Sequence, residues 1–258
     1  MRALAILLSA AALAIDGCSA AQPGTLGWQE AAELLSVRQL EGEADRNRMP
    51  RLANPADAPL LRAVFDLDGI WAMDHQDFPT IGKRCEPVRS IGRGYNALGT
   101  TFDRDGQLTA GQSAAMRRNW IDYHDELSLG AAALLLCIAR EGEAINRFTA
   151  ALPADQRTPF RHNAEVKARK KTANMLLAQI GMQSEARSYA SDANRRLLLD
   201  TLARAAPVIV DSITIEQRAT VRAAIDRQLP GLSARDRATL AGVRRVFEST
   251  SCEGACAD

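Results

Sequence analysis

The chain has 258 residues, with 32 Lys and Arg against 31 Asp and Glu, for a formal net charge of +1. Hydrophobic residues at 47% and charged residues at 24% are ordinary globular values, which excludes wholesale disorder, and the balanced charge gives no reason to expect nucleic acid as a partner. Ala, Leu and Arg are abundant, while aromatic residues make up only 5%, so the composition favours helices over strands.

The first twenty residues have the pattern of a secretory signal peptide. Arg2 provides a positive start, residues 3–15 are almost entirely apolar, and small residues follow up to Ala21. Cleavage after Ala20 or after Ala21 satisfies the small-x-small rule. The apolar run is shorter than the ~20 residues of a membrane-spanning helix. We therefore expect a periplasmic or secreted protein.

Residues 15–18 (Ile-Asp-Gly-Cys) resemble the lipobox of bacterial lipoproteins, in which the Cys becomes the lipidated first residue. The resemblance implies a lipid anchor on Cys18 and contact with a membrane surface. Asp16 departs from the motif, which has a small or apolar residue at that position. Lipoprotein processing stays open as the alternative. Beyond this segment the longest apolar run, residues 127–139, is too short to span a membrane and predicts a buried helix.

Four cysteines remain once Cys18 is removed or lipidated: Cys85, Cys137, Cys252 and Cys256. An even number in an oxidising compartment favours disulfides, and four cysteines allow three pairings. Cys252 and Cys256 lie four residues apart, so a local pair is easy to close, which would pair Cys85 with Cys137. A metal site is the alternative, but Cys252 and Cys256 have no nearby His.

The rest of the chain has the apolar spacing of helices, and the predicted fold is all-α, an irregular multi-helix bundle. We expect one domain over residues 21–250, followed by a Cys-containing tail at 251–258. Only residues 208–210 look strand-like, and one strand makes no sheet. The predicted helices are 28–46, a segment opening at Asn54-Pro55, 60–71, 109–140, 141–151, 158–180, 192–205, 215–228 and 234–247.

The helical pattern fails between residues 74 and 107. This stretch contains Pro79, Pro87 and several glycines, and it also holds Cys85. We therefore predict one long loop, about 74–107, held by its cysteine, because long loops in compact domains are usually functional or stapled.

A hydrophobic residue followed by Ser/Thr-x-x-Gln/Asp recurs before predicted helices, at 108–112, 213–217 and 232–236, and more loosely at 152–157. The spacing predicts helix caps, in which the Ser or Thr oxygen accepts from a first-turn amide. The pattern also resembles the LTxxQ motif of small periplasmic helical chaperones of the Spy type. That resemblance implies a chaperone-like alternative function.

Residues 62–69 (RAVFDLDG) resemble motif I of haloacid dehalogenase-type phosphatases. The resemblance implies a strand before Asp66, Asp66 as the phosphoryl-accepting nucleophile, Asp68 as general acid/base, and Mg²⁺ beside them. Ile70 replaces the usual Thr, and the other motifs of that family are missing. An apolar stripe over residues 60–71 instead favours a helix whose two Asp side chains face solvent or an Arg.

Residues 101–112 resemble an EF-hand calcium loop through Asp103, Asp105 and Gly106. Thr101 and Gln112 replace the first Asp and the last Glu, which removes ligand oxygens, so calcium binding should be poor. An Asp-Gly turn before a capped helix explains the same residues.

The remaining ionisable residues have ordinary interpretations. Asp122 and Glu126 are spaced to share a helix face, where we expect solvated carboxylates, and the three histidines (His75, His124 and His162) do not form a metal pattern. Basic residues crowd positions 157–171. We favour a charged face paired with Glu165 and Glu185, with binding to an anionic surface as the alternative.

The sequence thus predicts an exported, non-catalytic protein that binds or scaffolds in the cell envelope, through an unidentified envelope protein or ligand. It predicts no catalytic residue, cofactor or metal. The alternatives are a Mg-dependent phosphatase using Asp66 and Asp68, and a periplasmic chaperone-like protein.

Overall fold

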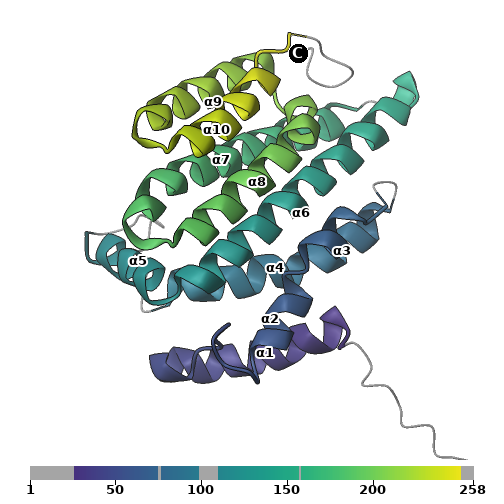
Figure 1. Cartoon of the computed structure of the whole chain (residues 1–258). Coiled ribbons are helices and arrows are strands. Elements are labelled where there is room, and N and C mark those ends of the chain that lie inside the picture. Colours follow the sequence, from purple (N-terminus) through teal and green to yellow (C-terminus); the bar gives the residue numbers. More distant parts are fainter. Residues whose placement is uncertain (1–25, 75–76, 99–109, 157, 251–258) are drawn as a thin grey trace, which may run out of the picture.

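A computed structural model describes residues 26–74, 77–98, 110–156 and 158–250 (Figure 1). Several sequence predictions fall outside these residues. They are the signal segment with its lipobox-like Cys18, His75, most of the calcium-like loop, and the tail with Cys252 and Cys256.

Every regular element in the described ranges is helical, which confirms the all-α prediction. Residues 208–210, which look strand-like in the sequence, lie at the end of a helix and the start of a 3₁₀ turn. The helices are α1 (Trp28–Ala44), α2 (Ala58–Val64), α3 (Leu67–Trp71), α4 (Phe78–Ala97), α5 (Ala110–Asp122), α6 (His124–Ala151), α7 (Pro159–Tyr189), α8 (Asp192–Ile209), α9 (Ile215–Gln228) and α10 (Ala234–Val246).

Helix α6 is the centre of the bundle. It packs against α3, α4, α5, α7 and α8, and its apolar run at 127–139 is buried as predicted (Figure 1). The pair α1 and α2 lies at one end of the molecule, and α9 and α10 lie at the other (Figure 1). One cluster of buried apolar side chains reaches from Ala31 in α1 to Phe247 after α10.

The predicted loop at 74–107 is wrong, because residues 78–97 form helix α4. Pro79 lies in the first turn, where its missing N–H has no helical partner to lose. Pro87 lies inside the helix, where proline normally removes a hydrogen bond and breaks the helix. The buried stripe formed by Ile81, Cys85, Val88, Ile91 and Tyr95, together with a disulfide, compensates by packing α4 along the bundle.

The boundaries predicted around α5 and α6 also need correction. The helix expected over 109–140 is interrupted at Tyr123, and α6 continues without a break to Ala151. Tyr123 is buried, its hydroxyl donates to the carbonyl oxygen of Arg46 over 2.9 Å, and its ring centroid lies 5.5 Å from that of Tyr95. These contacts hold the tyrosine in a non-helical conformation that turns the chain between the two helices.

The caps predicted at 213–217 and 232–236 are confirmed, whereas the looser match at 152–157 falls on the end of α6 and a 3₁₀ turn, for which no such cap is seen in the described residues. Thr214 and Gln217 form a full capping box at the start of α9, and Ser233 accepts from the amide of Asp236 at the start of α10. Because these bonds join residues three apart, the sequence places both helix starts correctly.

Close approach of α1 to α4 depends on Gly94. The Gln39 side-chain amide donates to the carbonyl oxygen of Ile91 over 2.8 Å. A Cβ at position 94 would lie 2.7 Å from the Gln39 amide nitrogen, so a larger residue there would displace the Gln39 side chain and its bond to Ile91.

Candidate ligand-binding groove between α4, α5, α6 and α7

Asp66 and Asp68 lie at the start of the short helix α3, Asp66 as its N-cap and Asp68 in its first turn, rather than at the end of a strand. The Asp66 carboxylate caps α3 by accepting from the amide of Gly69 over 3.1 Å, and α2 precedes it where the phosphatase resemblance implies a strand. The Asp68 side chain is 91% exposed and lies 2.9 Å from the guanidinium of Arg204. The single helix predicted over 60–71 is wrong, because the chain breaks at Phe65 and Asp66 between α2 and α3. Both Asp side chains are nevertheless exposed, and Asp68 lies beside an Arg, as predicted.

The expectation of two solvated carboxylates at Asp122 and Glu126 is wrong for Glu126. This residue is buried, and its carboxylate accepts from the backbone amide of Leu52 over 2.7 Å. Asp122 lies 2.9 Å from the guanidinium of Arg46. Both carboxylates thus fasten the segment after α1 onto the start of α6, because the break at Tyr123 turns them toward it.

The described histidines contribute no cluster of metal ligands. His124 Nδ1 lies 2.9 Å from the carboxylate of Asp125 and 3.2 Å from the side-chain nitrogen of Asn194, while His162 is exposed. Within the described residues, no group of three or more His, Cys, Asp or Glu side chains is placed to hold a metal ion.

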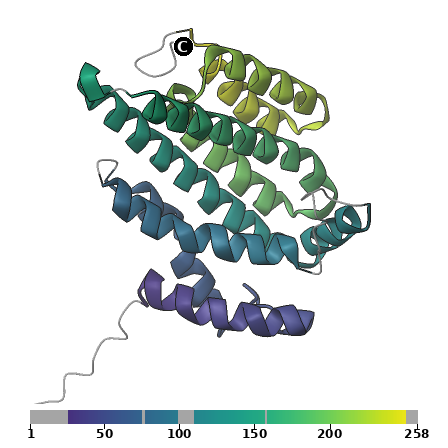
Figure 2. The same cartoon turned by 180° about the vertical axis from the view of Figure 1, so that it is seen from behind.

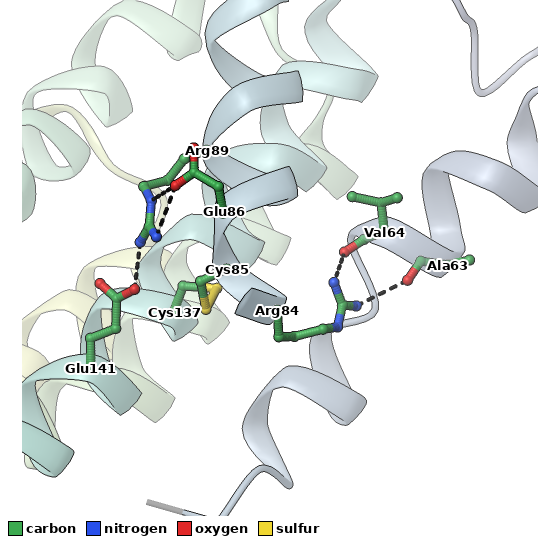
Figure 3. The surroundings of a disulfide bond; sticks show 8 residues. All are labelled: Ala63, Val64, Arg84, Cys85, Glu86, Arg89, Cys137 and Glu141. Atoms are coloured by element: carbon green, nitrogen blue, oxygen red, sulfur yellow. Dashed lines mark hydrogen bonds and ion pairs between the residues drawn. A yellow bond between two sulfur atoms is a disulfide. The ribbon is translucent and has the colours of Figure 1, made fainter. Parts of the chain in front are cut away.

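Cys85 of α4 and Cys137 of α6 form a fully buried disulfide with a Cα–Cα distance of 5.7 Å, which confirms the predicted pair (Figure 3). On one side of it, Arg84 donates to the carbonyl oxygens of Ala63 and Val64 at the end of α2 (Figure 3). Burial lowers the pKa of the Arg84 guanidinium, and the charge of Asp66 partly offsets that effect.

On the other side of the disulfide, Arg89 lies between Glu86 on its own helix and Glu141 on α6, at 3.2 Å and 2.5 Å (Figure 3). Burial alone would lower the pKa of Arg89, but the hydrogen bonds and charges of the two carboxylates outweigh it and raise this pKa. The covalent bond and the ion pairs together fix α4 against α6.

A groove of about 390 Å³ opens beside this junction, between α4, α5, α6 and α7. Figure 2 shows α6 between α4 and α7 on this side of the molecule. The floor is apolar and is formed on α6 by Leu127, Gly130, Ala131 and Leu134. Gly92 on the α4 wall faces open space, since no atom lies within 4 Å of where its Cβ would be.

Two amide side chains line the groove, and one of them has a buried polar atom without a partner. The side-chain oxygen of Asn96 on α4 is buried and has no hydrogen-bond partner. Gln179 on α7 is 5% exposed, and the structure gives its side chain no hydrogen bond to another described residue. A buried polar group without a partner costs about 1–3 kcal/mol, so such groups are rare and need an explanation.

Cations gather at the mouth of the groove. Arg89, Arg93 and Lys171 line it, and an adjoining hollow of about 470 Å³ on α7 is lined by Lys167, Lys170 and Lys171. Arg93 lies 3.6 Å from Glu86, whereas none of the three exposed lysines forms an ion pair within the described ranges.

The expected charged face at 157–171 is thus confirmed only in part. Arg169 is buried and pairs with Glu165 four residues earlier, as predicted. The side chain of Glu185 lies outside the described residues. The lysines of this segment line the hollow that adjoins the groove, and Lys171 also lines the groove itself.

Sequence reasoning missed the groove because it assigned residues 74–107 to a loop. The signal for its α4 wall is nevertheless present: Ile81, Cys85, Val88 and Tyr95 follow helical spacing, and Asn96 ends that face. Two prolines and several glycines concealed this periodicity.

No family model, curated protein or solved structure matches this chain. No helix in the described part is both long and apolar enough to cross a membrane. The groove is therefore interpreted from its own side chains.

Proposed function

We propose that this protein is an exported, non-catalytic binding protein of the cell envelope that holds a small ligand in the groove between α4, α5, α6 and α7. The observation that carries the proposal is an apolar groove with two amides on its walls, the buried Gln179 and Asn96, whose buried side-chain oxygen has no partner. Concave, mostly apolar sites with a few polar groups are the usual form of ligand pockets, which measure about 300–1,000 Å³.

The lining side chains suit binding. Apolar residues provide contact area, the amides and the indole of Trp120 provide hydrogen-bonding groups, and the mouth provides positive charge. The disulfide and the paired arginine next to the groove hold α4 and α6 in place. A preformed site of this kind binds with less loss of conformational entropy.

Export is supported by the signal-peptide pattern and by the Cys85–Cys137 disulfide, because disulfides persist in oxidising compartments. The intact mass of the protein from its native envelope tests this. A chain starting at Ala21 or Gln22 supports soluble export, and an acylated chain starting at Cys18 supports a lipoprotein. An uncleaved chain with free thiols contradicts export.

The groove is tested with the uncharged fluorescent probe N-phenyl-1-naphthylamine and the variant Gly92→Leu. The position of its Cβ is free of other atoms within 4 Å, so we expect the new side chain to occupy the groove. Gly82→Leu is the matched control, because Gly82 lies on the same helix, has equal free space and does not line the groove.

We expect the wild type and Gly82→Leu to bind the probe, and Gly92→Leu to lose most of the binding while keeping its helical circular dichroism. Equal binding by all three proteins would place the probe elsewhere and would overturn the proposal. Absence of binding by all three proteins would also contradict it.

A further inference from the structure

We infer that the ligand is an alkyl chain with an anionic group at one end and a hydrogen-bond donor at the other. This inference rests on the proposed function and specifies the class of ligand that the groove takes. Three features of the groove carry it: the cations at the mouth, the apolar floor, and the unpartnered amide oxygen at the far end.

The mouth has more positive than negative charge. Arg89 shares its charge with two carboxylates, and Arg93 lies near one of the same carboxylates. Lys171 and its neighbours Lys167 and Lys170 form no ion pair within the described ranges, although all three point toward one hollow. Neighbouring like charges raise the local potential, which favours an anion and disfavours a cation.

The two polar regions lie at opposite ends of the groove. Along α7, Lys171 and Gln179 are eight residues apart, or about 12 Å at the rise of an α-helix. Along α4, Arg89 and Asn96 are seven residues apart, or about 10 Å. Both helices run toward α5, so the cations share one end and the amides share the other (Figure 2).

The stretch between these ends is apolar. Val88, Ala131, Leu134 and Met175 line it, on three different helices. A volume of about 390 Å³ is near the lower limit of ligand pockets, which favours a single chain over a two-chain lipid. A donor at the far end would give the Asn96 side-chain oxygen the partner that it lacks, because this atom is a carbonyl oxygen, which only accepts.

Three probes of equal chain length separate these requirements: 10-hydroxydecanoate, decanoate, which lacks the hydroxyl, and 1,10-decanediol, which lacks the anion. Binding is measured by calorimetry with the full mature chain. We expect 10-hydroxydecanoate to bind most tightly. Loss of the hydroxyl or of the anion should each weaken binding about fivefold, which corresponds to roughly 1 kcal/mol for one hydrogen bond or one exposed charge pair.

Two variants assign these preferences to residues. Lys171→Glu should weaken the binding of 10-hydroxydecanoate about fivefold or more, since one exposed charge is reversed. It should leave the binding of the diol unchanged. Arg235→Glu on α10 is the charge-matched control, because Arg235 is exposed and does not line the groove. This variant should bind 10-hydroxydecanoate and the diol as tightly as the wild type does. Asn96→Leu should abolish the preference for 10-hydroxydecanoate over decanoate. Lys171→Glu changes an exposed side chain, so it remains informative if Asn96→Leu fails to fold.

Failure of the inference differs from failure of the proposed function. If the diol binds as tightly as 10-hydroxydecanoate, or if none of the three binds while the naphthylamine probe still does, the inference is overturned and the groove remains a binding site. A third outcome is that the wild type and Gly92→Leu bind vesicles of anionic phospholipid equally well, while the wild type binds no 10-hydroxydecanoate. The lysines would then bind a bilayer surface, and the inference would likewise be wrong.

Discussion

Removal of the Cys85–Cys137 disulfide in the double variant Cys85→Ala/Cys137→Ala should destabilise the protein strongly. The bond closes a loop with a sequence separation of 52 residues, for which the chain-entropy relation gives about 4 kcal/mol at 25 °C. The bond also lies beside Pro87, which weakens α4 locally, so packing of α4 on α6 depends on it more than in an uninterrupted helix. For a chain of this size, about 4 kcal/mol corresponds to a melting temperature lower by roughly 8–16 °C.

The assay is urea unfolding of the wild type and the double variant, followed by circular dichroism, with thermal melts as a second measure. Cys252→Ala/Cys256→Ala serves as the matched control, because any bond between these residues would close a loop of only about four residues and should contribute much less. The reasoning is refuted if the free energy of unfolding of the Cys85/Cys137 variant falls by less than about 1 kcal/mol, a quarter of the expected loss. It is also refuted if this free energy falls no more than that of the control.

Two further predictions concern the contacts of residues 46–57 with α6 and α4, where Glu126 accepts from Leu52 and the Tyr95 hydroxyl donates to the carbonyl oxygen of Pro50 over 2.7 Å. Glu126→Ala should lower the free energy of unfolding by about 1–3 kcal/mol, because the amide of Leu52 loses its buried acceptor. Glu126→Gln keeps an acceptor and should lower this free energy less. Equal losses for the two variants in urea unfolding would contradict the prediction. Burial raises the pKa of Tyr95, so its stabilising effect should be complete below pH ~10, the unfolded pKa, and should be lost as the pH rises above it toward the raised folded pKa. Tyr95→Phe should reduce this alkaline loss of stability, and an unchanged slope between pH 9 and 11 would rule out Tyr95 as its source.

The sequence predicted the fold class correctly because helix formation leaves local signals. The capping residues Thr214 and Ser233 mark the starts of α9 and α10 through bonds to amides three residues away. The apolar run at 127–139 predicted a buried helix, and α6 is the most central element of the bundle. Each of these signals is contained within a few turns of chain.

The candidate site was predictable only in part. The lysines at 167–171 were recognised as an unusual basic cluster, but their position at the mouth of a groove was not. The sequence pattern predicts a loop for the opposite wall and therefore assigns no binding role to Gly92 or Asn96. A groove between four helices is formed by residues far apart in sequence, and no local pattern specifies how those helices meet.

The sequence by itself determined the helices whose ends and faces are set by neighbouring residues, and it limited the cysteine pairings to three. Only the tertiary structure decided that residues 78–97 are helical despite Pro87, that the chain turns at Tyr123, and that Glu126 is buried. In each of these cases local preference was weak or unfavourable. Contacts with distant residues, among them a disulfide, a buried ring and the Leu52 amide, supplied the free energy that selected the observed conformation.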